Sequence, residues 1–338
     1  MADNSLNKVS YDFNSVSKKR ILVHVHLFYL EMWQEIQSCL KNLDKLHLKW
    51  DLYVTLVNKD ECNHIIKIKE IIQAFKPDAV VLTVANRGYD VGPFIEILNH
   101  VDLHNYDLVF KLHSKRNVNP LTTLGNFYDV SGPKWRVFLL SFICSQDKLK
   151  KLLKAFNTDP YLGMTASYNL IIPFRKHGKY NEWVLQECHK LFKQLNINPR
   201  PEKKFKYVAG TMFAVRAEIL QKIKELKLDI NSFSPPDRKN ERDLAHVLER
   251  FMGWIVTSIS AIENNLPTKN DSEVFFKIKD EFTCPFKRYT DFPAFISRHH
   301  LLVHILRFIL RREYDSNQNL IRIKVLKIPL VKYKIHKP

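Results

Sequence analysis

The sequence predicts an α/β fold with a mainly parallel sheet covered by helices on both faces. Apolar runs of strand length alternate with segments of helical periodicity from Arg20 to Leu112, in the order βαβαβαβ. Strands that alternate with helices in this way usually form parallel sheets, because each helix returns the chain to the same sheet edge.

The first half of the chain supplies four strands and three helices. The strands are β-rich runs, the first two helices have apolar residues at helical spacing, and the third carries proline in its first turn, where no backbone donor is lost. The predicted strands are Arg20–Tyr29, Trp50–Val57, Asp78–Val84 and Leu108–Leu112, and the predicted helices are Met32–Leu43, Glu61–Phe75 and Pro93–Val101.

The alternation weakens after the fourth strand. Asn117 to Lys134 contains two prolines and two glycines and is predicted as a loop over the carboxyl edge of the sheet. Further helices are predicted at Trp135–Cys144, Gln146–Phe156, Glu182–Leu195, Ala217–Leu226 and Asp243–Phe251. A short strand is predicted at Tyr161–Ala166, a basic loop at Arg175–Tyr180, and a strand pair or bent strand at Phe205–Arg216.

The composition indicates a globular protein of 338 residues, 45% of them apolar, with a net charge of +18. We expect a polar extension at 1–19, a main domain at 20–285 and a basic region at 286–338. Five scattered cysteines without a CxxC pair favour a reduced, cytoplasmic protein. No apolar signal sequence opens the chain, and no apolar run has the roughly 20 residues that a spanning helix needs.

The basic region concentrates charge, with ten Lys and Arg against two acids from Phe292 to Pro338. Its mixture of apolar and basic residues fits an amphipathic helix on an anionic membrane surface, and fits equally a terminal helix that packs on the core and keeps a solvated basic face. No helix-turn-helix, zinc-finger or RNA-binding motif accompanies the charge, so no nucleic-acid partner is expected.

Two strand ends carry the groups that we expect to bind an anionic ligand. The fourth strand leads into Lys111, His113, Lys115 and Arg116, the first three on one face of the strand. The third strand, which we expect to lie beside the fourth, leads into a turn with Gly88 and Gly92, which permit a close backbone approach, and with Asn86, Arg87 and Asp90. Arg87 suits a phosphate and Asp90 a sugar hydroxyl, although a solvated strand end and an Arg87/Asp90 staple would also account for these residues.

Four motifs in order resemble the rhamnan synthesis protein F family of bacterial polysaccharide glycosyltransferases. They are Asn86 to Pro93, Lys111 to Arg116, Gly210 to Arg216 and Leu244 to Arg250, and the resemblance covers roughly Arg20 to Ser260. It implies a GT-A-like fold, a nucleotide-diphospho-sugar donor, with dTDP-L-rhamnose used by the namesake, and a glycan or lipid-linked acceptor in lipopolysaccharide, O-antigen or capsule synthesis.

Many GT-A enzymes hold a divalent metal with an Asp-x-Asp signature after the fourth strand, where this chain reads His113-Ser114-Lys115. Cations there repel Mg²⁺ or Mn²⁺ and can neutralise the diphosphate themselves, so we expect no metal and no cofactor. His24, His26 and Tyr29 lie near the end of the first strand, where a nucleotide base commonly packs in such folds, although plain strand residues account for them at least as well. Gly210 and Thr211 resemble a strand passing close to bound sugar.

Inverting transfer needs a base for the attacking hydroxyl, and Glu241 and Asp243 are the candidates. In the family pattern, Asp-Gly-Thr precedes the Leu-Ala-His stretch, so in this chain Glu241 stands in place of the Asp and Asp243 in place of the Thr. Asp243 also suits the N-cap of the helix that follows, which is an alternative to a catalytic role. His246, Glu249 and Arg250 share one helix face and would meet the donor phosphates or one another.

The resulting interpretation is a metal-independent, inverting glycosyltransferase, peripheral on the inner face of the plasma membrane. The alternative is a non-catalytic carbohydrate- or membrane-binding scaffold of the same fold.

Overall fold

The computed structural model describes most of the chain between residues 20 and 260 and several segments beyond. The described residues are 20–57, 62–115, 122–124, 127–130, 132–167, 170–174, 179–237, 242–260, 275–279, 310–315, 320–325 and 328–334. The chain divides into two compact units, Met1–Ser114 with Leu139–Phe282, and Lys115–Phe138 with Thr283–Pro338.

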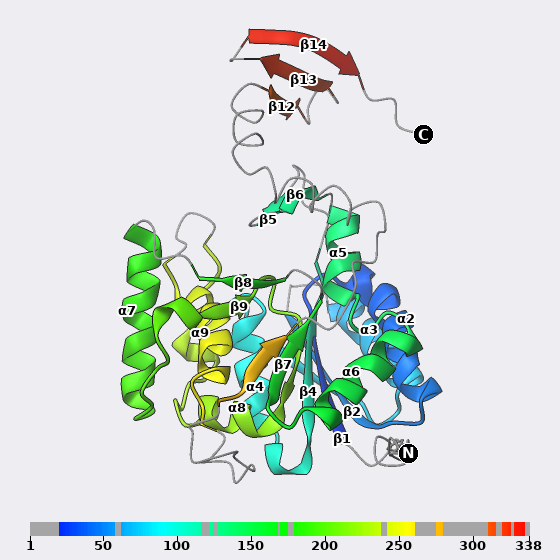
Figure 1. Cartoon of the computed structure of the whole chain (residues 1–338). Coiled ribbons are helices and arrows are strands. Elements are labelled where there is room, and N and C mark those ends of the chain that lie inside the picture. Colours follow the sequence, from blue (N-terminus) through cyan, green and yellow to red (C-terminus); the bar gives the residue numbers. More distant parts are fainter. Residues whose placement is uncertain are drawn as a thin grey trace, which may run out of the picture. The chain divides into compact units, whose positions relative to one another are not determined.

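A seven-stranded sheet forms the centre of the first unit, in the order β11-β7-β10-β4-β1-β2-β3 (Figure 1). β1 pairs in parallel with β2 and β4, and β2 in parallel with β3, whereas β10 runs antiparallel to both β4 and β7. The strands are β1 (Arg20–Leu27), β2 (Lys49–Val57), β3 (Val80–Val84), β4 (Leu108–His113), β7 (Leu162–Ala166), β10 (Phe213–Arg216) and β11 (Lys277–Lys279).

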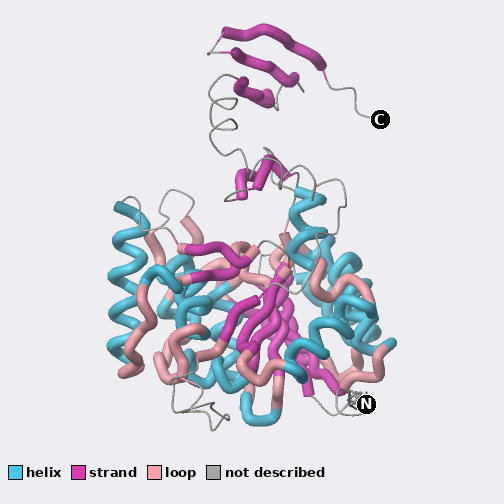
Figure 2. Tube along the Cα trace, in the orientation of Figure 1, coloured by secondary structure: helices cyan, strands magenta, loops and turns pink. Residues whose placement is uncertain are grey.

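Helices cover both faces of this sheet, with α2, α3 and α6 on one side and α4, α8 and α9 on the other (Figures 1 and 2). α4 packs on β1, α8 and α9, and α7 packs on α9. The helices are α2 (Trp33–Lys45), α3 (Cys62–Phe75), α4 (Val91–His100), α6 (Gln146–Thr158), α7 (Lys179–Gln194), α8 (Ala217–Lys224) and α9 (Leu244–Val256). The predicted α/β class, with a mainly parallel sheet and helices on both faces, is confirmed.

Short elements complete the first unit. β8 (Ile171–Pro173) and β9 (Lys206–Val208) form an antiparallel pair, so the predicted strand pair at Phe205–Arg216 becomes β9 and β10 in two separate sheets. Four 3-10 helices lie at Leu30–Met32, Leu103–Asn105, Glu202–Lys204 and Ile230–Ser232. None of the helices in the described part of the chain is long and apolar enough to cross a membrane.

The two central strands are buried because helices lie on both sides of them. Every residue of β4 is buried, as is every residue of β1 after Arg20. Most are aliphatic, as expected for a parallel sheet with two covered faces. The exceptions are Phe110 and the titratable residues His24, His26, Lys111 and His113.

The expected neighbourhood of the third and fourth strands is wrong. β3 pairs only with β2 within the described chain, and β1 and β2 separate it from β4. Sequence order carries no information about strand order in a doubly wound sheet, because a crossover helix can place the next strand on either side.

The second unit contains strands where the sequence analysis predicted a loop and a helix. β5 (Thr122–Leu124) and β6 (Phe127–Val130) form a hairpin, and α5 (Gly132–Leu140) follows. β12 (Leu310–Asp315), β13 (Leu320–Val325) and β14 (Ile328–Lys334) form an antiparallel sheet. The predicted helical tail is therefore wrong from residue 310 onward, where Ile321 to Val325 in β13 shows a regular alternation of apolar and basic residues. Residues 280–309, which include most of that predicted helix, lie outside the described residues, as do the 1–19 extension and most of the basic loop.

Candidate functional site

Two turns with left-handed backbone meet beside β4. Gly88 and Tyr89 have φ of 65° and 54°, and Gly210 and Thr211 have φ of 78° and 49°. A Cβ at Gly88 would come within 2.6 Å of the Phe233 ring, so only glycine fits there. Positive φ is unfavourable for tyrosine and more so for a β-branched threonine, and such backbone conformations cluster at functional sites.

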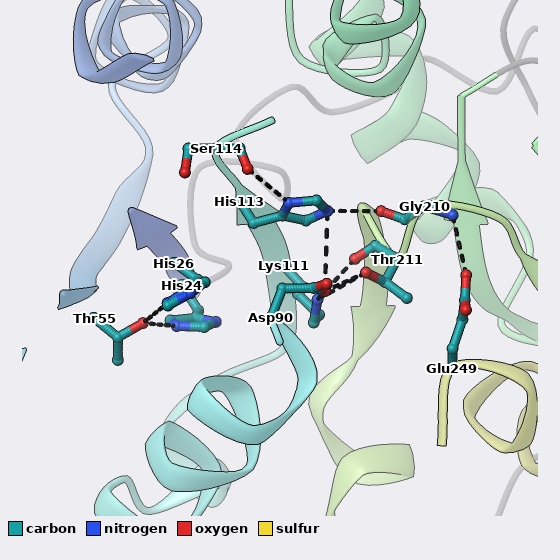
Figure 3. Close-up of polar contacts among 10 residues, drawn as sticks. All are labelled: His24, His26, Thr55, Asp90, Lys111, His113, Ser114, Gly210, Thr211 and Glu249. Carbon is teal, nitrogen blue, oxygen red and sulfur yellow. Dashed lines mark hydrogen bonds and ion pairs between the residues drawn. The ribbon is translucent and has the colours of Figure 1, made fainter. Parts of the chain in front are cut away.

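The turns bring Asp90 and Thr211 to the ammonium group of Lys111 (Figure 3). The Lys111 side chain is fully buried, and its Nζ donates to Asp90 Oδ2 and, at 3.1 Å each, to the carbonyl and hydroxyl oxygens of Thr211. The Thr211 hydroxyl also donates to Asp90 Oδ2. These three oxygens accept from the three N–H groups of Lys111, and the Asp90 carboxylate compensates its positive charge.

Asp90 is the anionic member of this cluster, and 21% of its side chain remains exposed. Burial alone would raise the pKa of Asp90, but His113, Lys111 and the hydrogen bond from Thr211 hold it well below its usual value. The group is therefore a carboxylate at neutral pH, with part of its surface accessible to a ligand.

His113 closes the cluster on the side of Gly210. Its Nε2 lies 2.8 Å from the Gly210 carbonyl oxygen and 3.9 Å from Asp90 Oδ2, and its Nδ1 lies 3.1 Å from the Ser114 carbonyl oxygen. A neutral imidazole donates to one carbonyl, whereas an imidazolium donates to both. Lys111 and His113 project toward the same carboxylate, as the period of two predicted.

His24 and His26 form a second, neutral layer on the neighbouring strand β1, opposite Lys111 and His113 in the pairing register. Both rings contact the Thr55 hydroxyl, at 2.9 Å from His24 Nε2 and 3.1 Å from His26 Nδ1, and His24 stacks on Phe94. Burial lowers the pKa of His24 well below its usual value and that of His26 to about 3. Neither imidazole carries charge at neutral pH, so both act as packed polar groups of the core.

The start of α9 lies against the same two turns. Asp243 caps the helix by accepting from the His246 backbone N–H at 2.9 Å, and its Oδ1 also lies 2.9 Å from His246 Nδ1. The His246 ring meets Tyr89 edge-on at 5.3 Å between centroids. One turn further, Glu249 accepts from the Gly210 backbone N–H at 3.3 Å and from Arg250 at 2.7 Å.

A family model for rhamnan synthesis protein F matches residues 1–260, more than three quarters of the chain. The chain belongs to the rhamnan synthesis protein F family. The resemblance drawn from the four motifs is thereby confirmed.

Two curated relatives come from two strains of Xanthomonas campestris pv. campestris, and both are described as uncharacterized protein WxcX. Each is 25% identical over 238 residues, which is 70% of this chain and 31% of the relative. This rhamnan synthesis protein F family member thus spans about a third of their length.

Solved structures with detectable similarity include a mycobacterial protein, at 16% identity and a TM-score of 0.30, with 62% of this chain and 57% of that one covered. Another is glucosyl-3-phosphoglycerate synthase from Mycobacterium tuberculosis in complex with Mn²⁺, UDP-glucose and phosphoglyceric acid, at 14% identity and a TM-score of 0.28, with 64% of each chain covered. Scores this low carry no argument about the site of this family member.

The predicted site residues separate into a connected group and a remainder. Asp90, Lys111, His113, Gly210, Thr211 and Glu249 form one hydrogen-bonded network, with His246, Asp243 and Arg250 beside it on α9 and His24 and His26 on the neighbouring strand. Arg87 is used within the fold, since it donates to the Phe233 carbonyl oxygen at 2.8 Å. Gly92 packs inside α4, where a Cβ would lie 2.4 Å from the Arg87 carbonyl oxygen.

The remaining predicted residues contribute no described polar side-chain contact to the network. Asn86 is exposed, and Tyr29 is tied to the end of β4 through its backbone N–H, which donates to the Ser114 hydroxyl at 2.9 Å. Lys115 is the first residue of the second unit, whereas Arg116 and Glu241 lie outside the described residues.

The site also contains three residues that were not predicted, namely Thr55, Phe94 and Tyr89. A threonine or phenylalanine within an apolar run gives no indication in the sequence that it belongs to a site. Tyr89 could have been predicted, because it stands between the predicted site residues Gly88 and Asp90. Among the described residues, no group of three or more His, Cys, Asp or Glu side chains could hold a metal ion.

Proposed function

We propose that this chain transfers a sugar from a nucleotide-diphospho-sugar to a glycan or lipid-linked acceptor during bacterial cell-surface polysaccharide synthesis. Membership of the rhamnan synthesis protein F family over residues 1–260 carries the proposal. The cluster beside the carboxyl half of β4 supports it, because the carboxyl ends of parallel strands are the ligand-binding edge of α/β sheets. A GT-A-like arrangement and an L-rhamnosyl donor, dTDP-L-rhamnose, are the forms of this activity that the family name favours.

In this proposal the buried and accessible groups divide the work of holding the donor. Lys111 already has three acceptors, so it acts by fixing Asp90 and by its positive field rather than by touching the ligand. The exposed part of the Asp90 carboxylate accepts a hydrogen bond from a hydroxyl of the ribose or of the sugar. Lys115 and Arg116, which follow β4 in the sequence, supply the charge that neutralises the diphosphate.

Transfer is proposed to be metal-independent and inverting. The carboxylate beside β4, Asp90, is bound by an ammonium and a hydroxyl, which leaves it a poor ligand for a divalent ion. A positive leaving-group site performs the same electrostatic work as a metal. The proton of the attacking hydroxyl leaves toward the start of α9, where Asp243 and His246 lie and which Glu241 precedes in sequence.

We further propose that the basic C-terminal region brings the protein to the anionic inner leaflet, where lipid-linked acceptors are presented. The ten Lys and Arg residues from Phe292 to Pro338 supply the attraction, at about 1 kcal/mol for each basic residue near such a surface.

A donor screen with and without EDTA tests the proposal. We expect release of a nucleoside diphosphate from one donor at the same rate in both conditions, and a Lys115→Ala variant that loses donor binding while an exposed control, Lys151→Ala on α6, keeps it. Turnover that stops with EDTA would overturn metal independence, and wild-type turnover by Lys115→Ala would overturn the diphosphate role. Binding without turnover of any donor would instead identify a non-catalytic carbohydrate-binding protein.

A further inference from the structure

The start of α9 carries a partly exposed histidine, His246, that is held at one ring nitrogen. Asp243 Oδ1 lies 2.9 Å from His246 Nδ1 and 2.9 Å from the His246 backbone nitrogen, so one carboxylate oxygen receives both N–H groups. The side chains are 28% exposed for His246 and 13% for Asp243. Nδ1 therefore bonds to Asp243, and Nε2 has no hydrogen-bond partner among the described residues.

This arrangement determines the tautomer of the neutral ring. An imidazole whose Nδ1 carries the proton donated to Asp243 presents a lone pair at Nε2. A carboxylate that orients a histidine and stabilises its protonated form is the arrangement by which histidines act as general bases for hydroxyl groups. Asp243 itself is less suited to that task. Partial burial raises the pKa of its carboxyl, but the hydrogen bonds from His246 outweigh this effect and lower the pKa, which makes Asp243 a weaker base.

The pair is continuous with the cluster around Asp90. Tyr89, which precedes Asp90 in its turn, lies edge-on to the His246 ring. Glu249, one helical turn after His246, accepts from the backbone N–H of Gly210, whose carbonyl faces His113. A ligand on the exposed edge of Asp90 would therefore lie beside the turn that contacts His246.

We propose that His246 Nε2 takes the proton of the acceptor hydroxyl during transfer and that Asp243 is the positioning residue that orients it. This inference rests on the proposed glycosyltransferase function and names the base of that reaction. The acceptor oxygen forms a bond to the anomeric carbon as its proton passes to Nε2. The bond from that carbon to the donor diphosphate breaks, and its electron pair leaves with the nucleoside diphosphate. His246 later releases the proton to water, so no further reactant is needed.

The groups around His246 predict the pH dependence of this step. Asp243 and Glu249 on α9 raise the pKa of His246, the hydrogen bond to Asp243 most of all, whereas burial and Arg250 lower it, and the net shift is upward from 6.5. From the turn before α4 the ring meets Tyr89. The base works in its neutral form, so transfer should rise with pH through this raised pKa and level off above it.

Three variants of the full chain test the proposal. His246→Gln removes the base, and we expect kcat to fall by about 100-fold or more, with nucleoside-diphosphate affinity within about twofold of wild type by titration calorimetry. Asp243→Asn keeps an oxygen that can cap α9 but removes the charge, so kcat should fall and the rising limb of the pH profile should move to lower pH. His104→Gln, an exposed histidine outside the site, is the matched control and should leave both unchanged.

A His246→Gln variant with wild-type kcat, or one that keeps the wild-type rising limb, would overturn the proposal. So would a wild-type rate that falls as pH rises through the raised pKa, which would make His246 an acid or a phosphate-binding cation. These outcomes all require that the wild-type chain turns over a donor. Failure of the wild-type chain in the donor screen would instead refute the function on which the inference rests.

Discussion

The buried pair of Lys111 and Asp90 predicts a strong and unequal response to single substitutions. Asp90→Asn removes the carboxylate from a fully buried ammonium that donates to two neutral oxygens of Thr211. Breaking a buried pair in this way costs about 3–5 kcal/mol of unfolding free energy. Lys111→Met should cost less, because Asp90 is 21% exposed and keeps the Thr211 hydroxyl as a donor.

The double variant separates compensation from simple packing. Replacing both charges removes the uncompensated group, so the double variant should recover much of the loss, with a coupling of about 2–3 kcal/mol in the cycle. Urea unfolding of all four proteins gives the cycle. The more exposed pair of Lys222 and Glu225, with Nζ and Oε1 3.1 Å apart, is the control, and its cycle should give about 0.2–1 kcal/mol.

Additive losses in the Lys111/Asp90 cycle would refute the reasoning, because they would mean that each residue is stabilised independently. A loss below about 1 kcal/mol for Asp90→Asn would refute it as well, because removing the carboxylate partner of a fully buried ammonium costs more than that.

Two further predictions concern pH and backbone conformation. His24 and His26 have depressed pKa values in the folded chain, so the unfolded chain binds more protons below pH 6.5. The unfolding free energy should therefore fall as the pH falls from 6.5 toward 4, by about 2.7 kcal/mol per pH unit for the two groups. His26→Asn should roughly halve that slope, and an unchanged slope in urea titrations would contradict the prediction. The partly exposed His246 has a raised pKa and affects stability in the opposite direction. Its contribution to the unfolding free energy is present below pH 6.5 and is lost as the pH rises above its pKa in the folded chain. Gly88→Ala places a Cβ 2.6 Å from Phe233 at a φ of 65° and should lower stability by roughly 1–3 kcal/mol, whereas an unchanged urea midpoint would show that the turn can relax.

The strands and helices of the first half of the fold were predictable because each has a continuous local signal. The runs at Arg20, Trp50 and Leu108 lead into β1, β2 and β4, each within one or two residues of its predicted bounds. The common face of Lys111 and His113 followed from the strand period alone. Local sequence patterns were sufficient to predict features that depend only on residues close together in the sequence.

The contacts of the site were not predictable because they join distant segments. The partners of Lys111 lie 21 and 100 residues away, at Asp90 and Thr211. They meet because β10 inserts between β4 and β7, and no local pattern specifies that order. The strands β12 to β14 were missed for a different reason, since basic residues among apolar ones fit either an amphipathic helix or a strand.

The opposite polarity of β10 has a consequence for how this protein folds during synthesis. Because β10 runs antiparallel to β4, the loop before it, with Gly210 and Thr211, arrives at the carboxyl end of β4, where we propose that the donor binds. A nascent chain that has reached residue 114 holds Lys111 and Asp90 but lacks two of the three acceptors of the ammonium group. The first four strands therefore leave Lys111 without its Thr211 acceptors until about a hundred more residues have been made. The antiparallel strand that extends the sheet beyond β4 also completes the hydrogen bonds of the site.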